Sequence, residues 1–203
     1  TENPVIEQME FDMADMGCAL CIVDVGGNHA DLTHEYAAIP AEMKQVASFF
    51  GKEFLRGVTC RELLENAPAI REKFGDRAFL RAFHFVNENE RVGKIVDAVR
   101  ARDYGAFKKL IIESGNSSFR YLQNVYASSA PEEQGMSVAL AIAEQVLDGC
   151  GAWRVHGGGF GGTTQNFVPF DKVEESRREI ESVFGEGSCH ILSIRSIGGT
   201  QVL

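Results

Sequence analysis

The segment from His156 to Gly162, His-Gly-Gly-Gly-Phe-Gly-Gly, places five glycines within six positions. Because glycine has no Cβ, such a backbone can adopt positive φ angles and bring main-chain N–H groups toward a bound anion. The flanking residues, 153–156 and 163–168, are rich in β-branched and aromatic side chains and predict two strands. The segment therefore predicts one of two loops. The first is a phosphate-facing loop, and the second is a glycine-rich hairpin or bulge. His156 either donates to a phosphate or sugar oxygen or is a strand-end histidine whose ring is satisfied by backbone.

Two nucleotide-binding motifs can be tested against this loop. The spacing Gly157-x-Gly159-x-x-Gly162 matches the dinucleotide fingerprint, but that motif needs a helix directly after it, whereas a strand ending at Pro169 is expected here. The pattern G-x-x-x-x-G-K-[ST] does not occur in the chain. The sequence therefore excludes a Rossmann-type site and a Walker-type ATPase.

Apolar periodicity and turn residues predict the other elements. A buried strand is expected at 18–25 and a last strand at 189–196. Helices are expected at 34–50, at 60–66, over 76–112 with a break near Gly105, from Pro131 to 148, and at 171–184. Thr33 and Gly51 are the expected caps of the first helix, Pro68 is expected to end the second, and residues 114–118 have turn chemistry.

This order of elements predicts an α+β fold in which helices pack on one face of a small, mainly antiparallel sheet. A doubly wound parallel sheet is less favoured because it would need more regular alternation of strands and helices. Neither a repeat nor a Pro/Gly/Ser-rich linker divides the chain, so residues 1–203 are expected to form one domain. With 44% hydrophobic residues, a chain of this length can bury about 70% of its unfolded surface without disulfides.

The charge balance restricts the partners of this domain. Lys and Arg number 20 against 29 Asp and Glu, a net charge of -9, which argues against binding to nucleic acid or to an anionic membrane. The first sixteen residues contain five acidic residues and no Lys or Arg, and no apolar run approaches the ~18 residues that a bilayer span needs. We therefore expect a cytoplasmic location.

The five cysteines, Cys18, Cys21, Cys60, Cys150 and Cys189, are expected to be reduced and structural. Cys18 and Cys21 form a C-x-x-C motif, but they lie in a predicted strand, where residues three apart point to opposite faces. No second pair of Cys or His at ligand spacing follows, so no metal site is expected.

The glycine segment Gly157-Gly-Gly-Phe-Gly-Gly162, after a short predicted strand, is similar to the third motif of the GHMP kinase family and, within that family, to the motif of the galactokinases. Further collinear segments that resemble galactokinases are Glu35-Tyr36, 51–58, 79–91, 103–114 and 196–203. The resemblance therefore covers nearly the whole chain.

The resemblance implies the GHMP kinase C-terminal domain, without the N-terminal catalytic domain. The parent activity implied is transfer of the ATP γ-phosphate to the anomeric hydroxyl of galactose or a related sugar, with ATP and Mg²⁺ bound mainly by the absent domain. Tyr36 would contact the sugar, the alternative being an ordinary residue of an amphipathic helix between the domains. A loop at the phosphate site would be formed by His156, Gly157, Gly158, Gly159, Phe160, Gly161 and Gly162. No catalytic residue is assigned to this chain, which alone is expected to be inactive. A sensor that binds sugar and ATP without turnover, or a structural fragment that binds nothing, are the alternatives.

The chain departs from the family pattern at several positions, and the Ser-x-x-Glu-Leu-Asp segment that usually follows the last of them is missing. His156 stands where the family motif has Thr, Thr163 where it has Cys, and Gly115 where it has a His in Glu-Ser-His-x-Ser-Leu-Arg. These departures put the sugar specificity in question and leave the expected fold unchanged.

Overall fold

The computed structural model describes residues 6, 7, 9, 11–27 and 32–193. The strands are β1 (Cys18–Asp24), β2 (Ala152–Val155), β3 (Thr163–Pro169) and β4 (Cys189–Leu192). The α-helices are α1 (Thr33–Phe49), α2 (Cys60–Glu65), α3 (Ala67–Phe74), α4 (Asp76–Arg100), α5 (Tyr104–Ser117), α6 (Gly135–Leu147) and α7 (Val173–Phe184). Short 3₁₀ segments occupy Met13–Met16 and Phe170–Lys172, and a π-helical turn, Ser118–Leu122, extends α5.

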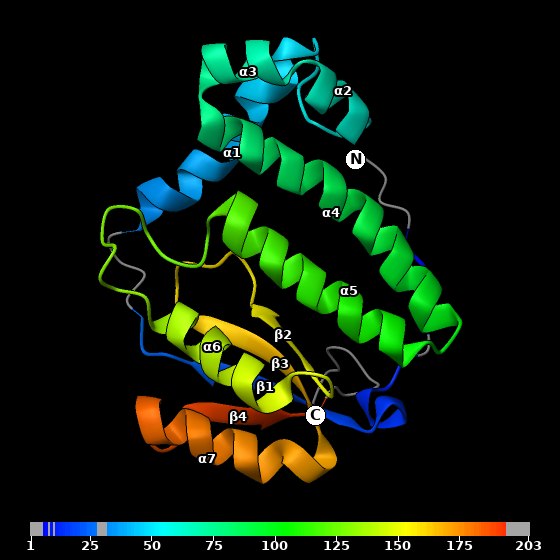
Figure 1. Cartoon of the computed structure of the whole chain (residues 1–203), viewed down its shortest axis with the longest axis vertical. Coiled ribbons are helices and arrows are strands. Elements are labelled where there is room, and N and C mark those ends of the chain that lie inside the picture. Colours follow the sequence, from blue (N-terminus) through cyan, green and yellow to red (C-terminus); the bar gives the residue numbers. More distant parts are fainter. Residues whose placement is uncertain (1–5, 8, 10, 28–31, 194–203) are drawn as a thin grey trace, which may run out of the picture.

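The four strands form one antiparallel sheet in the order β2-β3-β1-β4. β1 lies inside the sheet and pairs along its full length with β3, so that Cys21 is opposite Asn166. The α+β class with a small antiparallel sheet is confirmed. Helices α6 and α7 lie beside the sheet in Figure 1.

Side chains of β1 alternate between two apolar clusters. Ala19, Cys21 and Val23 pack with residues of α6 and α7, whereas Cys18 and Leu20 pack with Phe107 and Ile111 of α5. The prediction that Cys18 and Cys21 point to opposite faces is therefore confirmed, and both thiols are free and buried.

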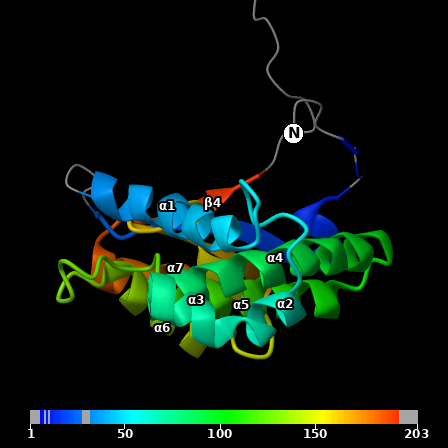
Figure 2. The same ribbon diagram turned by 90° about the horizontal axis from the view of Figure 1, so that it is seen from above.

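The first four helices form a separate apolar cluster away from the sheet, at the top of Figure 1. An ionic cluster joins α1 to α4: Glu42 accepts hydrogen bonds from Arg77 and from Arg81, whose side chain is 1% exposed. Helices α1 and α4 are in contact, and Figure 2 shows both of them from above. This packing sets the position of α1, whose first turn enters the candidate site.

The structure corrects the expected boundaries around α5. The break between α4 and α5 lies at residues 101–103, where the Asp103 side chain caps α5, and Gly105 is the second residue of that helix. Residues 114–118 were expected to be a turn, and this expectation was wrong. Ser114 and Ser117 are buried within α5, where they contact Glu88 and His84 of α4. These contacts between helices outweigh the local preference of Ser, Gly and Asn for turns.

Three other helix boundaries also differ from the expectation. Pro68 is the second residue of α3, in the first turn where proline is tolerated, and does not end α2. The segment from Pro131 forms turns, and α6 begins only at Gly135. Thr33 is the first residue of α1, so Leu32 is its N-cap. Within the described part of the chain, no helix combines the length and the hydropathy that crossing a membrane requires.

Candidate functional site

The glycine loop, residues 156–162, connects β2 to β3 and changes character along its length. His156, Gly157 and Gly158 are exposed, whereas Gly159 to Gly162 are buried. Positive φ angles occur at Gly157, Gly159 and Gly162 and also at Phe160, with φ 50°. A loop of unusual backbone geometry between two strands is therefore confirmed, and its second half is packed against the protein.

Asn124, which follows the π-helical turn, holds the middle of this loop. Its carbonyl oxygen accepts a 2.7 Å hydrogen bond from the Phe160 N–H, and its side-chain Nδ2 donates to the Gly158 carbonyl over 3.1 Å. A Cβ added to Gly159 would lie 2.0 Å from the Asn124 carbonyl oxygen. Position 159 therefore requires glycine because two backbone segments meet there.

The end of the loop is joined to the end of β1. The Val25 N–H donates a 2.8 Å hydrogen bond to the Gly162 carbonyl, and a Cβ on Gly162, with φ +99°, would lie 2.9 Å from the Gly27 nitrogen. The backbone is therefore closely packed at Gly162 as well as at Gly159. This contact holds the residues that follow β1 against the loop.

Tyr36, in the first turn of α1, reaches the same loop from the other side. Its hydroxyl donates a 2.5 Å hydrogen bond to the Gly159 carbonyl, and its ring meets the Phe160 ring edge to face at 5.1 Å. Burial raises the pKa of the Tyr36 phenol, so the group stays protonated. The structure therefore brings Tyr36 and the glycine loop into direct contact.

Glu35, the neighbour of Tyr36, is a buried carboxylate that fixes a second loop. Its Oε1 accepts hydrogen bonds from the hydroxyls of Ser128, over 3.2 Å, and Ser129, over 3.1 Å. Burial by itself would raise the pKa of Glu35, but the hydrogen bonds from Ser129 and Ser128 outweigh it and lower the pKa. The first turn of α1 thus holds the 128–129 segment through Glu35 and the glycine loop through Tyr36.

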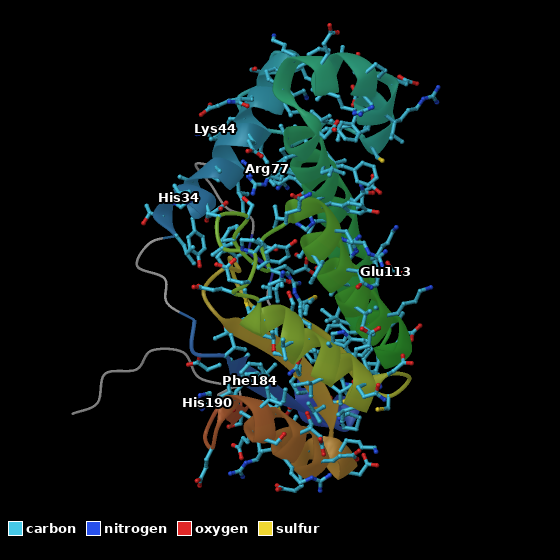
Figure 3. The ribbon with its side chains drawn as sticks, turned by 60° about the vertical axis from the view of Figure 1, so that its left-hand side comes forward. His34, Lys44, Arg77, Glu113, Phe184 and His190 are labelled. Atoms are coloured by element: carbon cyan, nitrogen blue, oxygen red, sulfur yellow. The ribbon has the colours of Figure 1, made fainter. Side chains whose placement is uncertain are left out.

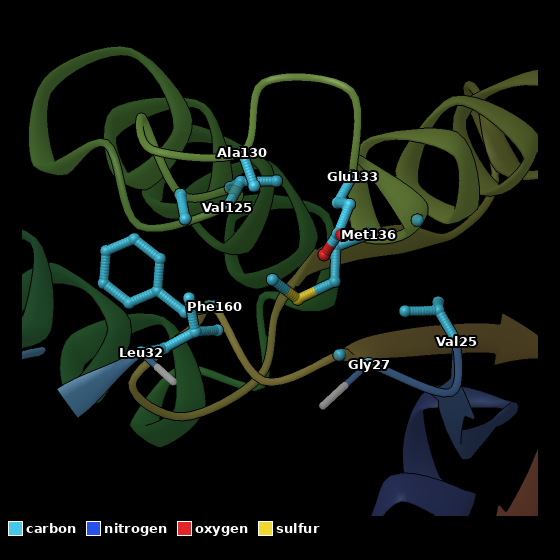
Figure 4. A pocket seen from close by; sticks show the side chains of 11 residues that line it. Val25, Gly27, Leu32, Val125, Ala130, Glu133, Met136 and Phe160 are labelled. Carbon is cyan, nitrogen blue, oxygen red and sulfur yellow. The ribbon is translucent and has the colours of Figure 1, made fainter. Parts of the chain in front are cut away.

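A cavity of about 180 Å³ opens between these two loops and the end of β1 (Figure 4). The side chains that line it are mainly apolar, with Glu133 as the charged one, and backbone of three glycines completes the lining. The lining residues are Val25, Gly27, Leu32, Val125, Ala127, Ala130, Glu133, Gly135, Met136, Phe160 and Gly162.

The geometry limits how this loop could bind an anion. The N–H groups of Phe160 and Gly161 donate to the carbonyls of Asn124 and Gly159. A phosphate would therefore have to use other amides of the loop, such as those of the exposed Gly157 and Gly158. The phosphate role stays a prediction.

The histidines are distributed over different parts of the molecule. His156 is exposed, and its Nδ1 lies 3.3 Å from the Thr163 hydroxyl. Figure 3 shows His34 at the start of α1 and His190 on β4, well apart from each other. His29 lies outside the described residues. In the described part of the chain, no group of three or more His, Cys, Asp or Glu side chains could hold a metal ion.

Gly115, where the family pattern has a histidine, faces β2. A Cβ there would lie 2.9 Å from the Arg154 Cβ and 3.1 Å from the Trp153 carbonyl. This departure from the family pattern is therefore tied to close helix–strand packing.

Reasoning from the sequence missed Asn124, Ser128 and Ser129. None of them belongs to a motif, and each reaches the site only because the chain folds back after α5. Gln123, a non-glycine residue with φ 56°, marks the point of that reversal, and nothing in its local sequence indicates it.

The chain is similar in sequence to galactokinases. The galactokinase of Homo sapiens is 32% identical to the chain over 199 residues, which cover 98% of this chain and 47% of that protein. The galactokinase of Actinobacillus pleuropneumoniae serotype 3 (strain JL03) is 31% identical over 164 residues, 81% of this chain and 41% of that protein. The chain thus spans about half the length of these relatives. No model of a protein family matches it.

A solved structure shows the same fold. The structure of Lactococcus lactis galactokinase complexed with galactose superposes with a TM-score of 0.67 and 23% sequence identity, covering 88% of this chain and 45% of that one.

Proposed function

Because this chain belongs to the galactokinase family and spans about half the length of its relatives, we propose that residues 1–203 are the C-terminal domain of a cytoplasmic, ATP-dependent sugar kinase. An N-terminal domain would complete the enzyme. The reaction is transfer of the ATP γ-phosphoryl group to the anomeric hydroxyl of galactose or a related sugar.

The observation that carries this proposal is the contact of Tyr36 with the glycine loop, whose Phe160 and Gly162 line the cavity. An aromatic ring can pack against the face of a sugar, and a phenolic oxygen that donates its own proton can still accept a hydrogen bond from a sugar hydroxyl. Tyr36 would form a wall of the sugar site. The loop from His156 to Gly162 would lie where sugar and phosphate meet.

The chemical step itself is assigned to the other domain. By family resemblance, an Asp there accepts the proton of the sugar hydroxyl, and an Arg lies near the transferred phosphoryl group. Mg²⁺, when bound, would neutralise charge on that group, and the proposal assigns the ion and most contacts with ATP to the other domain. The domain described here would bind and orient the sugar and exclude water as the cleft closes.

A coupled kinase assay tests the proposal. This chain alone, with galactose, ATP and Mg²⁺, is expected to give no turnover, because the base and the cations that stabilise the transition state are absent. A polypeptide that joins it to the N-terminal half of a galactokinase is expected to release ADP only when sugar is present. Turnover by the chain alone would contradict the domain assignment. Sugar binding without turnover in the joined protein would favour a sensor.

A further inference from the structure

Asn124 is 1% exposed and makes two hydrogen bonds to the glycine loop, one on each side of Gly159. Its Nδ2 holds the Gly158 carbonyl, and its own carbonyl holds the Phe160 N–H. The carbonyl of Gly159, between them, accepts the hydroxyl hydrogen of Tyr36. The position of the Gly159 oxygen, and with it the direction of the Tyr36 hydroxyl, therefore depends on how Asn124 holds the two neighbouring residues.

The hydrogen bond from Asn124 to Gly158 leaves the oxygen of the same side-chain amide unsatisfied. Its Oδ1 is buried and has no hydrogen-bond partner within the described residues. Turning the amide over would not remove the problem, because Oδ1 would then face the Gly158 carbonyl and two acceptors would oppose each other. A buried acceptor without a donor is unfavourable, so the contact with Gly158 is the reason for an amide at this position.

We propose that Asn124 is a positioning residue, which fixes Gly158 to Phe160 so that the Gly159 carbonyl orients Tyr36 toward the bound sugar. Only the identity of the bound molecule rests on the proposed function. The positioning of the loop and of Tyr36 belongs to the chain itself and can be measured without any ligand.

The first experiment uses Asn124→Asp in the full chain, observed by NMR without sugar. At pH 8 the carboxylate cannot donate to Gly158, so the amide resonances of residues 158–160 and the ring carbons of Tyr36 are expected to shift. Burial raises the pKa of a carboxyl group, so lowering the pH toward 5 should protonate the new Asp, whose O–H then donates to Gly158 and restores the original spectrum. If the spectral changes came from a general structural defect and not from loss of the hydrogen bond to Gly158, lowering the pH would not restore the spectrum.

Asn89→Asp is the matched control, because Asn89 also donates its Nδ2 to a backbone carbonyl over 3.1 Å, on α4. This variant is expected to show the same pH response at residues 158–160 as the parent chain, so that only Asn124→Asp differs from the parent at pH 8 and approaches it toward pH 5. Unchanged loop and Tyr36 resonances in Asn124→Asp at pH 8 would overturn the proposal.

Asn124→Ala covers the case in which the buried carboxylate prevents folding. It removes the donor and the unpaired acceptor together. Hydrogen exchange of the Phe160 amide should then be about fivefold faster, the factor that corresponds to one hydrogen bond of about 1 kcal/mol, while amides of β1 and β3 keep their rates. Equal exchange of Phe160 in parent and variant would overturn the proposal.

The kinase joined from two halves supplies the last test. Asn124→Ala should raise the KM for sugar about fivefold and leave the KM for ATP unchanged. In a Tyr36→Phe background, which lacks the hydroxyl, the same change should add no further effect. An undiminished effect in that background would overturn the proposal. If the joined protein turns over no sugar at all, the proposed function fails, and the loop measurements alone decide the role of Asn124.

Discussion

The hydroxyl of Tyr36 donates a 2.5 Å hydrogen bond to the carbonyl oxygen of Gly159, 123 residues later in the chain. This bond links the first turn of α1 to the loop between β2 and β3. The helical cluster of α1 to α4 and the sheet therefore meet at the candidate site.

Tyr36→Phe removes this hydrogen bond and keeps the ring against Phe160. We expect the free energy of unfolding to fall by about 0.5–1.5 kcal/mol, and Tyr36→Ala to lower it further because the ring contact is also lost. Urea titration of both variants measures this. Tyr121→Phe is the control, because no hydrogen bond of the Tyr121 hydroxyl occurs within the described residues and its ring packs edge to face on Phe83. Equal losses in the Tyr36 and Tyr121 variants would contradict the prediction.

The same substitution separates two roles toward the sugar in the joined kinase. If the Tyr36 hydroxyl bonds to the sugar, directly or through its orientation by Gly159, Tyr36→Phe should weaken sugar affinity by about 0.5–1.5 kcal/mol and leave ATP affinity unchanged. Tyr36→Ala should weaken it more. Calorimetric titration decides, and sugar affinity unchanged in both variants would make Tyr36 a packing residue only.

Gly159→Ala and Gly157→Ala form a matched pair within the loop. Both positions have positive φ, +79° and +64°, but a Cβ at 159 would lie 2.0 Å from the Asn124 carbonyl, whereas one at 157 meets nothing within 4 Å. We expect Gly157→Ala to cost about 1–2 kcal/mol, the penalty for a left-handed conformation. Gly159→Ala should cost clearly more, because the loop must also move away from Asn124. Thermal unfolding of the two variants makes the comparison, and equal melting temperatures would rule out the close contact.

The buried side chain of His84 should lower the free energy of unfolding in mild acid. It is buried between α4 and α5 with its Nδ1 2.9 Å from the Ser117 hydroxyl, and burial, together with Arg91 and Arg154, lowers its pKa to about 4 despite the opposing charge of Glu88. The unfolded state, with an ordinary His pKa near 6.5, therefore binds a proton that the folded state does not. Stability from this group is complete above pH about 6.5 and falls as the pH decreases toward about 4.

His84→Asn should flatten the pH dependence in that interval, measured by denaturant titration at a series of pH values. His190→Asn, at an exposed position on β4, is the control and should leave the slope as in the parent. If the free energy of unfolding of His84→Asn still changed with pH as in the parent, groups other than His84 would be the cause.

Glu35 should give the stability of the folded chain a second pH dependence, at lower pH than that of His84. Its pKa in the folded chain lies below the usual 4.5 because the hydrogen bonds from Ser129 and Ser128 outweigh burial. The stability it contributes is therefore present above pH about 4.5 and is lost as the pH falls through the lowered pKa. Glu35→Gln should lower the melting temperature at pH 7, and the difference from the parent should shrink in strong acid. The exposed Glu72→Gln on α3 should have no comparable effect, and a Glu35→Gln difference independent of pH would contradict the assignment.

The local sequence determined the strands of the sheet and the position of the loop. Alternating and β-branched residues at 18–24, 152–155 and 163–169 favour strands whatever surrounds them, and glycines allow the positive φ angles between β2 and β3. Family resemblance added Tyr36, which the structure places on that loop. These features depend on local backbone preferences or on a recurring motif, so they can be read from the sequence.

Tertiary structure alone decided the helical course of 114–118 and the meeting of Asn124 with Gly159. Ser114 and Ser117 remain in α5 because Glu88 and His84 of α4 satisfy their hydroxyls, partners that lie 26 and 33 residues away. Asn124 reaches the glycine loop because the chain reverses at Gln123, in a conformation that its own sequence disfavours and that surrounding contacts impose. A local sequence carries no information about which distant group will satisfy a buried hydrogen bond, and such bonds are what complete this site.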